Sequence, residues 1–244
     1  MRVLIVGGTS AIASETAKRF AREGAHLFLT GRNTERLAAV ADDLRVRGAA
    51  RVDTAVLDVA DIASHRRVIE SAVATLGGLD VALVAHGSLP DQRRCQEVVN
   101  EALEALHLNF TATIALLTLL ANKLESQRSG CLAVITSVAG DRGRASNYVY
   151  GAAKGGVQIF LQGLRARLLR ANVAVVTIKP GFVDTPMTAG FKKNALFADA
   201  GRVGRGIHRA IKRRSDVVYL PWFWRPIMTV LASLPERVFK RLHL

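Results

Sequence analysis

The sequence predicts an α/β fold of the Rossmann-like kind: a doubly wound, mostly parallel seven-stranded sheet with helices on both faces. Seven short runs rich in β-branched and aliphatic residues alternate with longer segments of helical pattern. The runs are nearly continuous in apolar residues, which is typical of strands buried on both faces. A glycine-rich turn directly follows the first run. In such a fold, ligands bind beyond the carboxyl ends of the strands.

The seven strands have short bounds and leave room for crossover helices between them. They are expected, in chain order, at residues 3–6, 27–30, 53–57, 81–85, 132–136, 173–179 and 217–220. Right-handed crossovers then place the helices on both faces of the sheet. The 244 residues, half of them hydrophobic, suffice for one domain around one sheet. We expect the Rossmann-type domain at residues 1–220, with residues 221–244 as its hydrophobic and basic C-terminal extension.

The charge of the chain is strongly positive and uneven. The formal net charge is +14, and residues 188–244 hold twelve Lys and Arg against three Asp and Glu, a local charge of +9. An anionic partner is therefore expected for the C-terminal quarter. No zinc-finger spacing, basic zipper or aromatic RNA-binding motif accompanies the charge, so we expect no nucleic-acid partner.

Cysteine and histidine indicate neither a disulfide framework nor a metal site. Cys95 and Cys131 have no paired spacing, and the six histidines show no ligand pattern. No uninterrupted apolar run reaches the roughly 18 residues that span a bilayer. We expect a cytoplasmic protein without a structural metal.

The glycine-rich turn between the first strand and the first helix is a candidate cofactor site. Its residues are Gly7, Gly8, Thr9, Ser10, Ala11, Ile12 and Ala13. Backbone N–H groups in this strand–turn–helix setting can bind a pyrophosphate. Alanine stands at two positions where the usual fingerprint has glycine, so the turn by itself fits either a dinucleotide site or a plain structural turn.

The residues after the second strand bear on the type of dinucleotide. An acidic residue there binds the ribose hydroxyls of NAD, whereas a cation accepts the extra phosphate of NADP. The chain has Arg32 and Asn33, with no carboxylate before Glu35. Because a guanidinium suits a phosphate, we expect NADP(H) to be preferred, with NAD(H) as the other option. The alternative is that Arg32 is a solvated loop residue.

A tyrosine and a lysine four residues apart form the strongest signal. Tyr150 and Lys154 lie on one face of a helix, one turn from each other. A nearby ammonium and the positive ring of an oxidised nicotinamide favour the phenolate, so we expect the pKa of Tyr150 to fall toward the working range. Tyr150 would then act as a general acid or base. Ser137, at the end of a strand, is placed to stabilise negative charge on a substrate oxygen.

Asn109, Ser137 and then Tyr150-Gly-Ala-Ala-Lys154, in this order after the turn, resemble the short-chain dehydrogenase/reductase family over residues 1 to 220. The resemblance implies an NAD(P)-dependent oxidoreductase in which Lys154 also holds the cofactor ribose. It implies that Asn109 supports a water linking Lys154 to solvent. The further cofactor contacts that it implies are Asp58 and Val59 beside the adenine, and Pro180, Gly181, Val183 and Thr185 on the nicotinamide side. Ala85, His86 and Gly87 stand where the family has Asn-Asn-Ala-Gly, a departure that affects the local hydrogen bonding.

Residues 141–150 and 219–242 are similar to one subgroup, the reductases of decaprenylphosphoryl-2-keto-ribose. The similarity implies a lipid-linked or phosphorylated keto-sugar as substrate. Two guanidinium groups near the carbonyl site suit a phosphate, so we expect Arg142 or Arg144 to bind it, the alternative being a solvated loop. The cations and aromatic residues after residue 220 fit peripheral contact with the inner face of a membrane. Alternatively, residues 227–234 close the pocket or an oligomer interface.

The main functional hypothesis is a keto-reductase that takes hydride from NADPH. A second hypothesis is reduction of another apolar ketone, of steroid, retinoid or acyl type. A third is a dinucleotide-sensing protein without turnover, which the four residues Asn109, Ser137, Tyr150 and Lys154 argue against. Family likeness also implies a homo-oligomer, either a dimer or a tetramer.

Overall fold

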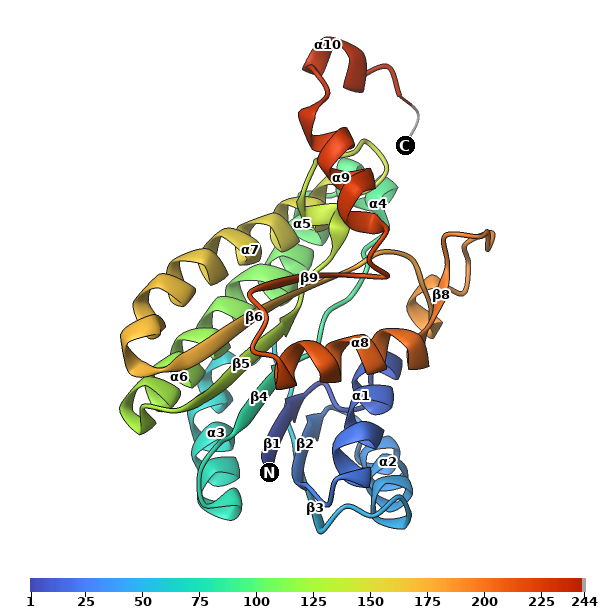
Figure 1. Ribbon diagram of the computed structural model, residues 1–244. Helices are drawn as coiled ribbons and strands as arrows, with labels where there is room; N and C mark the ends of the chain where they lie inside the picture. The colour runs from blue at the N-terminus through green and yellow to red at the C-terminus, as the bar shows by residue number, and fades with distance from the viewer. Residues whose placement is uncertain (243–244) are drawn as a thin grey trace.

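A seven-stranded parallel sheet forms the centre of the molecule (Figure 1). The computed structural model describes residues 1–242, and its strands lie in the order β3-β2-β1-β4-β5-β6-β9. Their bounds are β1 (Arg2–Val6), β2 (His26–Gly31), β3 (Arg51–Val56), β4 (Val81–Val84), β5 (Gly130–Ile135), β6 (Val173–Pro180) and β9 (Val217–Leu220). Every neighbouring pair is parallel. A separate pair of short strands consists of β7 (Val183–Asp184) and β8 (Ala198–Asp199).

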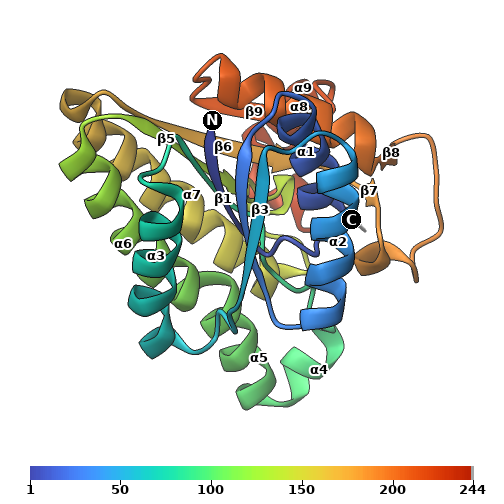
Figure 2. The same ribbon diagram turned by 90° about the horizontal axis from the view of Figure 1, so that it is seen from below.

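The helices form one layer on each face of the sheet (Figure 2). One layer consists of α1 (Ala11–Arg22), α2 (Thr34–Val46) and α8 (Ala200–Lys212). The other consists of α3 (Ile62–Leu76), α6 (Ala112–Gln127) and α7 (Tyr148–Leu168). The remaining helical segments are α4 (Gln92–Glu97), α5 (Val99–Leu106), α9 (Trp224–Ser233), α10 (Glu236–Phe239), the π-helical turn η1 (His107–Thr111) and the 3₁₀ turns η2 (Val138–Gly140), η3 (Leu169–Ala171) and η4 (Pro186–Thr188).

The alternation of side chains along β1 shows how the two cores arise. Val3 and Ile5 belong to the cluster packed against α1, α2 and α8, whereas Leu4 and Val6 belong to the cluster packed against α3, α6 and α7. Successive side chains of a strand point to opposite faces, and here helices bury both faces of the sheet. The central strands are therefore continuous apolar runs, because no position along them faces water.

The predicted fold class is confirmed, and all seven expected strands are present. Their observed bounds differ from the expected ones by at most two residues, as in β3, which spans Arg51–Val56 instead of 53–57. The pair β7 and β8 was not predicted, and its strands have only two residues each. The order of the strands reverses between β1 and β4, which opens a crevice beyond their carboxyl ends.

One long helical stretch, Val99–Gln127, is apolar and long enough to cross a membrane. It comprises α5, η1 and α6, and polar residues interrupt it, so it contains no long uninterrupted apolar run. In this fold Leu116, Leu117 and Leu120 are fully buried in the core between the helix and the sheet. In this stretch 39% of the most apolar window is buried in the domain, so packing accounts for part of its apolar composition.

The C-terminal extension leaves the sheet after β9 and rises above it as α9 and α10 (Figure 1). Trp224 and Met228 of α9 are buried and pack with Val138 in a small core of their own. Phe182, after β6, packs against the same cluster. The extension therefore contacts both loops that follow β5 and β6.

Candidate active site

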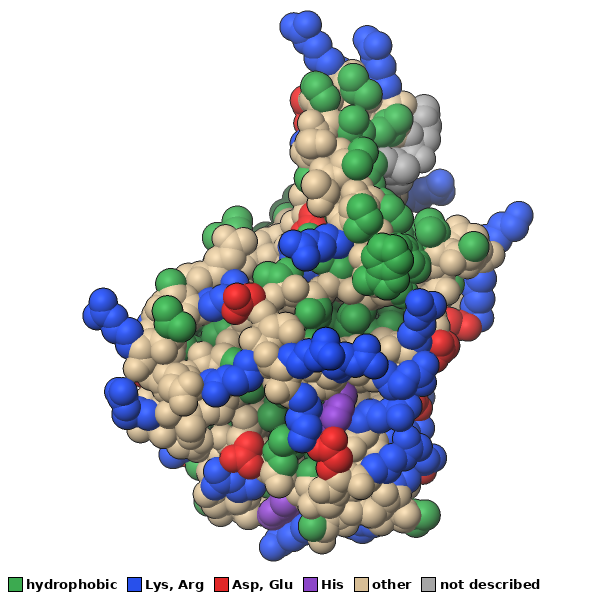
Figure 3. All heavy atoms as spheres, viewed as in Figure 1, with side chains coloured by type: hydrophobic (Ala, Val, Ile, Leu, Met, Phe, Trp, Pro, Cys, Tyr) green, Lys and Arg blue, Asp and Glu red, His purple; other side chains and the backbone are tan. Residues whose placement is uncertain are grey.

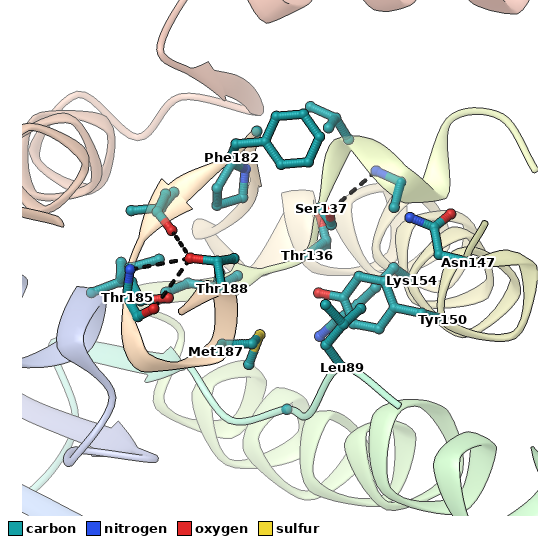
Figure 4. Close-up of a pocket in the computed structure, with 18 of the residues that line it drawn as sticks. Leu89, Thr136, Ser137, Asn147, Tyr150, Lys154, Phe182, Thr185, Met187 and Thr188 are labelled. Carbon is teal, nitrogen blue, oxygen red and sulfur yellow. Dashed lines mark hydrogen bonds between the residues drawn. The ribbon is translucent and has the colours of Figure 1, made fainter. Parts of the chain in front are cut away.

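A cavity of about 140 Å³ lies beyond the carboxyl ends of β4, β5 and β6 (Figure 4). Ser137, Tyr150 and Lys154 all line it. Figure 4 shows the hydroxyls of Ser137 and Tyr150 and the amine of Lys154 turned toward the same space. The structure thus brings together three residues that are separated in the sequence by up to 17 positions. Asn109 lies beneath the cavity and does not line it.

Close packing between η2 and α7 sets the position of Ser137 beside Tyr150. A β-carbon on Gly155 would lie 2.9 Å from the carbonyl oxygen of Gly140, and one on Gly151 would lie 2.9 Å from that of Ala139. Larger residues would push the turn away from the helix. Gln158, one turn further along α7, donates to the carbonyl oxygen of Ser137 at 2.7 Å. Helix α7 therefore holds the strand end from which Ser137 projects.

Burial controls the protonation of the two ionisable residues of the cavity. Desolvation raises the pKa of Tyr150 to about 12, and a hydrogen bond with Ser137 opposes that rise. Desolvation also lowers the pKa of Lys154 to about 8. The ammonium nitrogen lies 5.6 Å from the centre of the Tyr150 ring. The expected fall in the pKa of Tyr150 is therefore not found, because the rise caused by burial exceeds the lowering by the hydrogen bond with Ser137.

Asn109 occupies a π-helical turn between α5 and α6, where one extra residue interrupts the α-helical hydrogen bonds. The side chain is fully buried. Its amide donates to the carbonyl oxygen of Ala105 at 3.0 Å, and its oxygen accepts from the backbone N–H of Ser88 at 3.1 Å. The Oδ1 atom of Asn109 and the Nζ atom of Lys154 both face Gly87, within 3.0 and 3.1 Å of where its β-carbon would lie. Asn109 thus ties the loop after β4 to the region of Lys154.

His86 lies between the cavity and Thr113 of α6. Its Nε2 atom is 2.9 Å from the hydroxyl oxygen of Thr113. That hydroxyl can itself donate to the backbone carbonyl oxygens of Leu108 and Asn109. When the hydroxyl donates to one of these carbonyls, the ring donates from Nε2 and Nδ1 carries no proton. Desolvation and the charge of Lys154 lower the pKa of His86 to about 3, so the ring is neutral. Among residues 1–242, Nδ1 has no hydrogen-bond partner.

A second cleft continues from the cavity across the carboxyl ends of β1 and β2. Gly7, with φ +83°, bends the chain at the end of β1, and a β-carbon there would lie 2.9 Å from the backbone nitrogen of His86. Ser10 caps α1 without a side-chain bond to the first turn, so the N–H groups of that turn remain available to an anion. The cleft is lined by the predicted residues Gly7, Thr9, Ser10, Ala11, Ile12, Arg32, Asp58, Val59, Ala85, His86, Gly87 and Thr185.

The cavity and the cleft share several lining residues and form one continuous site. Ser10, Ile12, Ala85, His86, Gly87 and Thr185 line both. Pro180, Gly181 and Val183 line the cavity on the side of β6. The available N–H groups at one end, the close glycine turn and the buried Lys154 at the other fit a nicotinamide dinucleotide laid along this site.

Two arginines, not one, face the cleft at the end of β2. Arg32 lines it as expected, and so does Arg36, one helical turn further on in α2. Arg36 was not predicted, because Arg32 precedes the helix and only the folded chain brings the two side chains to one cleft. Asn33 differs from its expected role. Its side-chain oxygen caps α2 by accepting from the N–H of Arg36 at 2.8 Å, and it does not line the cleft.

The two arginines near the carbonyl site lie in different surroundings. Arg142 points to the C-terminal extension, where it donates to Glu236 at 2.6 Å and lies 4.3 Å from the centre of the Phe239 ring. Arg144 lines the cavity beside Asn147. Burial lowers the pKa of Arg144, and among the described residues its Nε atom has no hydrogen-bond partner. Only Arg144 is therefore placed to meet a molecule in the cavity.

Apolar residues complete the wall of the cavity, and the sequence analysis did not identify them. They are Leu89, Val138, Phe182, Met187 and Phe191. Met187 and Phe191 belong to the segment between β7 and β8, and each leaves about half of its surface exposed. No motif marks them, because an apolar pocket lining has the same composition as a core.

Known proteins resemble this chain over most of its length. A family model described as short chain dehydrogenase matches residues 1–195. A relative named as an uncharacterized oxidoreductase of Mycobacterium tuberculosis is 38% identical over 240 residues, covering 98% of this chain and 96% of the relative.

Two solved structures share the fold. A variant of actinorhodin polyketide ketoreductase with NADPH has a TM-score of 0.80 and 20% identity, covering 90% of this chain and 95% of that one. An alcohol dehydrogenase from the archaeon Thermococcus sibiricus, complexed with 5-hydroxy-NADP, also has a TM-score of 0.80 and 20% identity, with the same coverage of both chains.

Proposed function

Because this chain belongs to the short chain dehydrogenase family and is an NAD(P)-dependent oxidoreductase, we propose that it reduces a ketone to an alcohol with NADPH. The observation that carries the proposal is the convergence of Ser137, Tyr150 and Lys154 on one cavity that continues into a dinucleotide cleft. When bound there, the cofactor supplies the hydride.

The protonation of the cavity supplies the proton donor that reduction of a ketone requires. With a pKa raised to about 12, Tyr150 holds its proton at neutral pH and can donate it to the oxygen of the ketone. The hydroxyl of Ser137 donates a hydrogen bond to the same oxygen as negative charge develops there. Lys154 replaces the proton that Tyr150 gives up, and Asn109 holds the loop through which that proton is exchanged with solvent.

The direct test is oxidation of NADPH that depends on an added ketone. In Tyr150→Phe we expect kcat to fall at least about 100-fold, because proton donation contributes that much, while the Kd for NADPH stays within about twofold. Tight NADPH binding by the native protein without turnover of any ketone would instead favour a dinucleotide sensor. Near-normal kcat in Tyr150→Phe would remove Tyr150 as the proton donor.

We propose NADPH over NADH because Arg32 and Arg36 both face the adenosine end of the cleft. Their guanidinium groups can bind the 2′-phosphate from two sides. In Arg32→Ala, and further in Arg32→Ala/Arg36→Ala, we expect KM for NADPH to rise while KM for NADH changes little. Equal kcat/KM for the two cofactors in the native enzyme would contradict this preference.

We further propose that the substrate carries a phosphate, as a lipid-linked or phosphorylated keto-sugar does. The support is Arg144, a partly desolvated guanidinium in the cavity whose Nε atom lacks a partner among the described residues. In Arg144→Ala we expect KM to rise at least about tenfold on a phosphorylated ketone and little on its uncharged analogue, because a charged hydrogen bond contributes about 1.5–3 kcal/mol.

Arg142→Ala is the matched control for that measurement, because Arg142 contacts the C-terminal extension instead of the cavity. If Arg144→Ala loses the same factor on both substrates, Arg144 does not bind a phosphate. The apolar lining by Leu89, Phe182, Met187 and Phe191 would then favour the second candidate, a reductase of an uncharged apolar ketone.

A further inference from the structure

A group of unpaired arginines covers the face of the molecule formed by α1 and α8. It consists of Arg19 and Arg22 of α1, Arg202, Arg205 and Arg209 of α8, and Arg213 at the end of α8, and we call it the arginine surface. Two adjoining hollows run across it and share Arg205 and Arg209. The one carboxylate lining either hollow is Glu23, which is already bound by His208 and Lys212.

The arginine surface is not neutralised within the chain. Among residues 1–242, none of its six guanidinium groups forms an ion pair, whereas Arg45 of α2 and Arg47 just after it pair with Asp42 and Asp43. Like charges held together on one helix face destabilise it. A polyanionic partner would remove that repulsion, so we expect the arginine surface to bind a negatively charged partner.

An exposed tryptophan adjoins the arginine surface, and further exposed apolar side chains lie on the C-terminal extension. Trp222 lines the second hollow together with Arg205 and Arg209, and 72% of its surface is exposed. Val230 of α9 and Val238 of α10 are also exposed. Figure 3 shows these two features on one side of the molecule: a band of Lys and Arg over α8, and hydrophobic side chains running up the C-terminal extension above it.

We propose that this face binds the surface of a bilayer that contains anionic phospholipids. Cations beside an exposed tryptophan and aliphatic residues are the combination that an anionic interface binds, with the charges at the headgroups and the indole at the acyl boundary. A nucleic acid would satisfy the arginines but not the apolar residues, and a second copy of this basic face would repel the first. The proposal does not depend on the reaction catalysed.

The structure also indicates how the contact is made. The apolar side of α8, which includes Val203, Ile207 and Ile211, is buried against the sheet. Helix α8 therefore cannot insert, and its arginines make an electrostatic contact from above the headgroups. Trp222 and the exposed side of α9 are the groups free to enter the interface. Binding should for this reason be sensitive to salt and also shift the environment of Trp222.

The first test is sedimentation of the full-length protein with vesicles of phosphatidylglycerol and phosphatidylcholine, at low and at high salt. We expect binding to anionic vesicles that falls with salt, and little binding to pure phosphatidylcholine. In Arg205→Glu/Arg209→Glu the partition coefficient should fall at least about tenfold. The matched control is Arg67→Glu/Arg170→Glu, which makes the same change of charge at exposed arginines of α3 and η3 and should bind within about twofold of the native protein.

The second test uses tryptophan fluorescence, since Trp224 is buried and Trp222 is exposed. Anionic vesicles should shift the emission to the blue in the native protein and not in Trp222→Phe. Equal binding by the arginine variant and its control would overturn the proposal. So would binding of a duplex DNA with no binding of vesicles. Unchanged NADPH binding in each variant shows that it is folded.

Discussion

Tyr150 and Lys154 share one buried wall, yet their pKa values move in opposite directions. Removing water from a group disfavours its charged form, which raises the pKa of an acid and lowers that of a base. Tyr150 is therefore kept as a neutral phenol, and Lys154 is brought close to losing its proton. The spacing of the pair could be read from the sequence, but these directions could not, because they depend on how deeply the cavity is desolvated.

The lowered pKa of Lys154 predicts how cofactor affinity depends on pH. The ammonium is present below about pH 8 and is lost as the pH rises through that value. Because the charged form holds the cofactor, we expect the Kd for NADPH to increase between pH 7 and pH 9.5. In Lys154→Arg, whose guanidinium stays charged, the dependence should disappear. Fluorescence titration of NADPH across this range measures both, and an equal dependence in the two proteins would contradict the assignment.

His86 predicts a loss of stability in acid. Its pKa is about 3 in the folded protein and near 6.5 when unfolded, so the unfolded chain binds the extra proton between these values. The free energy of unfolding should therefore fall below pH 6.5, by up to about 1.4 kcal/mol per pH unit from this group. Urea unfolding at pH 7 and pH 5 measures the loss.

The matched variant for that measurement is His86→Gln, whose amide can still donate to Thr113 but does not titrate. It should lose less stability than the native protein between the two pH values. Some loss should remain, because burial also lowers the pKa of His65. An identical loss in the native protein and the variant would show that His86 does not contribute.

At the scale of the element, Arg142 links the loop after β5 to α10. Two contacts could hold α10 against this loop. One is an ion pair of Arg142 with Glu236, whose side chain is 74% exposed. The other is the packing of the guanidinium on Phe239, which is buried. An exposed ion pair contributes little, about 0–1 kcal/mol, whereas truncating a buried phenylalanine costs more, about 3–5 kcal/mol. The packing on Phe239 should therefore dominate.

We accordingly expect Phe239→Ala to release α10 and Glu236→Gln to leave it in place. Limited trypsin digestion measures the release, because Arg237 and Lys240 lie in or beside this helix. Cleavage there should be faster in Phe239→Ala and unchanged in Glu236→Gln. The reverse order would show that the ion pair holds the helix.

A partly buried ionic group also contacts the loop after β5. Lys179 of β6 lies 2.6 Å from Asp141, and the hydroxyl of Tyr219 of β9 donates to the same carboxylate at 2.9 Å. The sequence could not predict this group, because its members lie on three separate elements. These two contacts hold Asp141 in place at the start of the loop that carries Arg144.

At the scale of the whole molecule, the fold was predictable because the strands are buried on both faces and are therefore apolar throughout. The catalytic candidates were predictable because Ser137, Tyr150 and Lys154 follow a known order. Arg36 and the wall residues Met187 and Phe191 were not, because only the folded chain brings them to the site. The sequence also could not distinguish Arg142 from Arg144, because only the packing of the extension draws Arg142 away from the cavity.

The extension should be required for turnover but not for cofactor binding. It packs on Val138 and Phe182, which line the cavity, whereas the cleft for the dinucleotide lies on residues before it. We expect a chain ending at Leu220 to bind NADPH within about threefold of the native Kd and to lose most of its kcat/KM for the ketone. Circular dichroism checks that it is folded, and full turnover by the shortened chain would contradict the prediction.

Gly181 and Trp224 have a consequence for how this chain can change. A β-carbon at position 181 would lie 1.9 Å from the indole nitrogen of Trp224, so no other residue fits at 181 while the indole stays in place. The two positions are therefore epistatic: Gly181→Ala should be tolerated only together with a smaller residue at 224. If the C-terminal extension of a relative replaced this one, the relative's residue at position 224 would meet a loop whose Gly181 fits Trp224. The tail and the loop should be inherited, and engineered, as a unit.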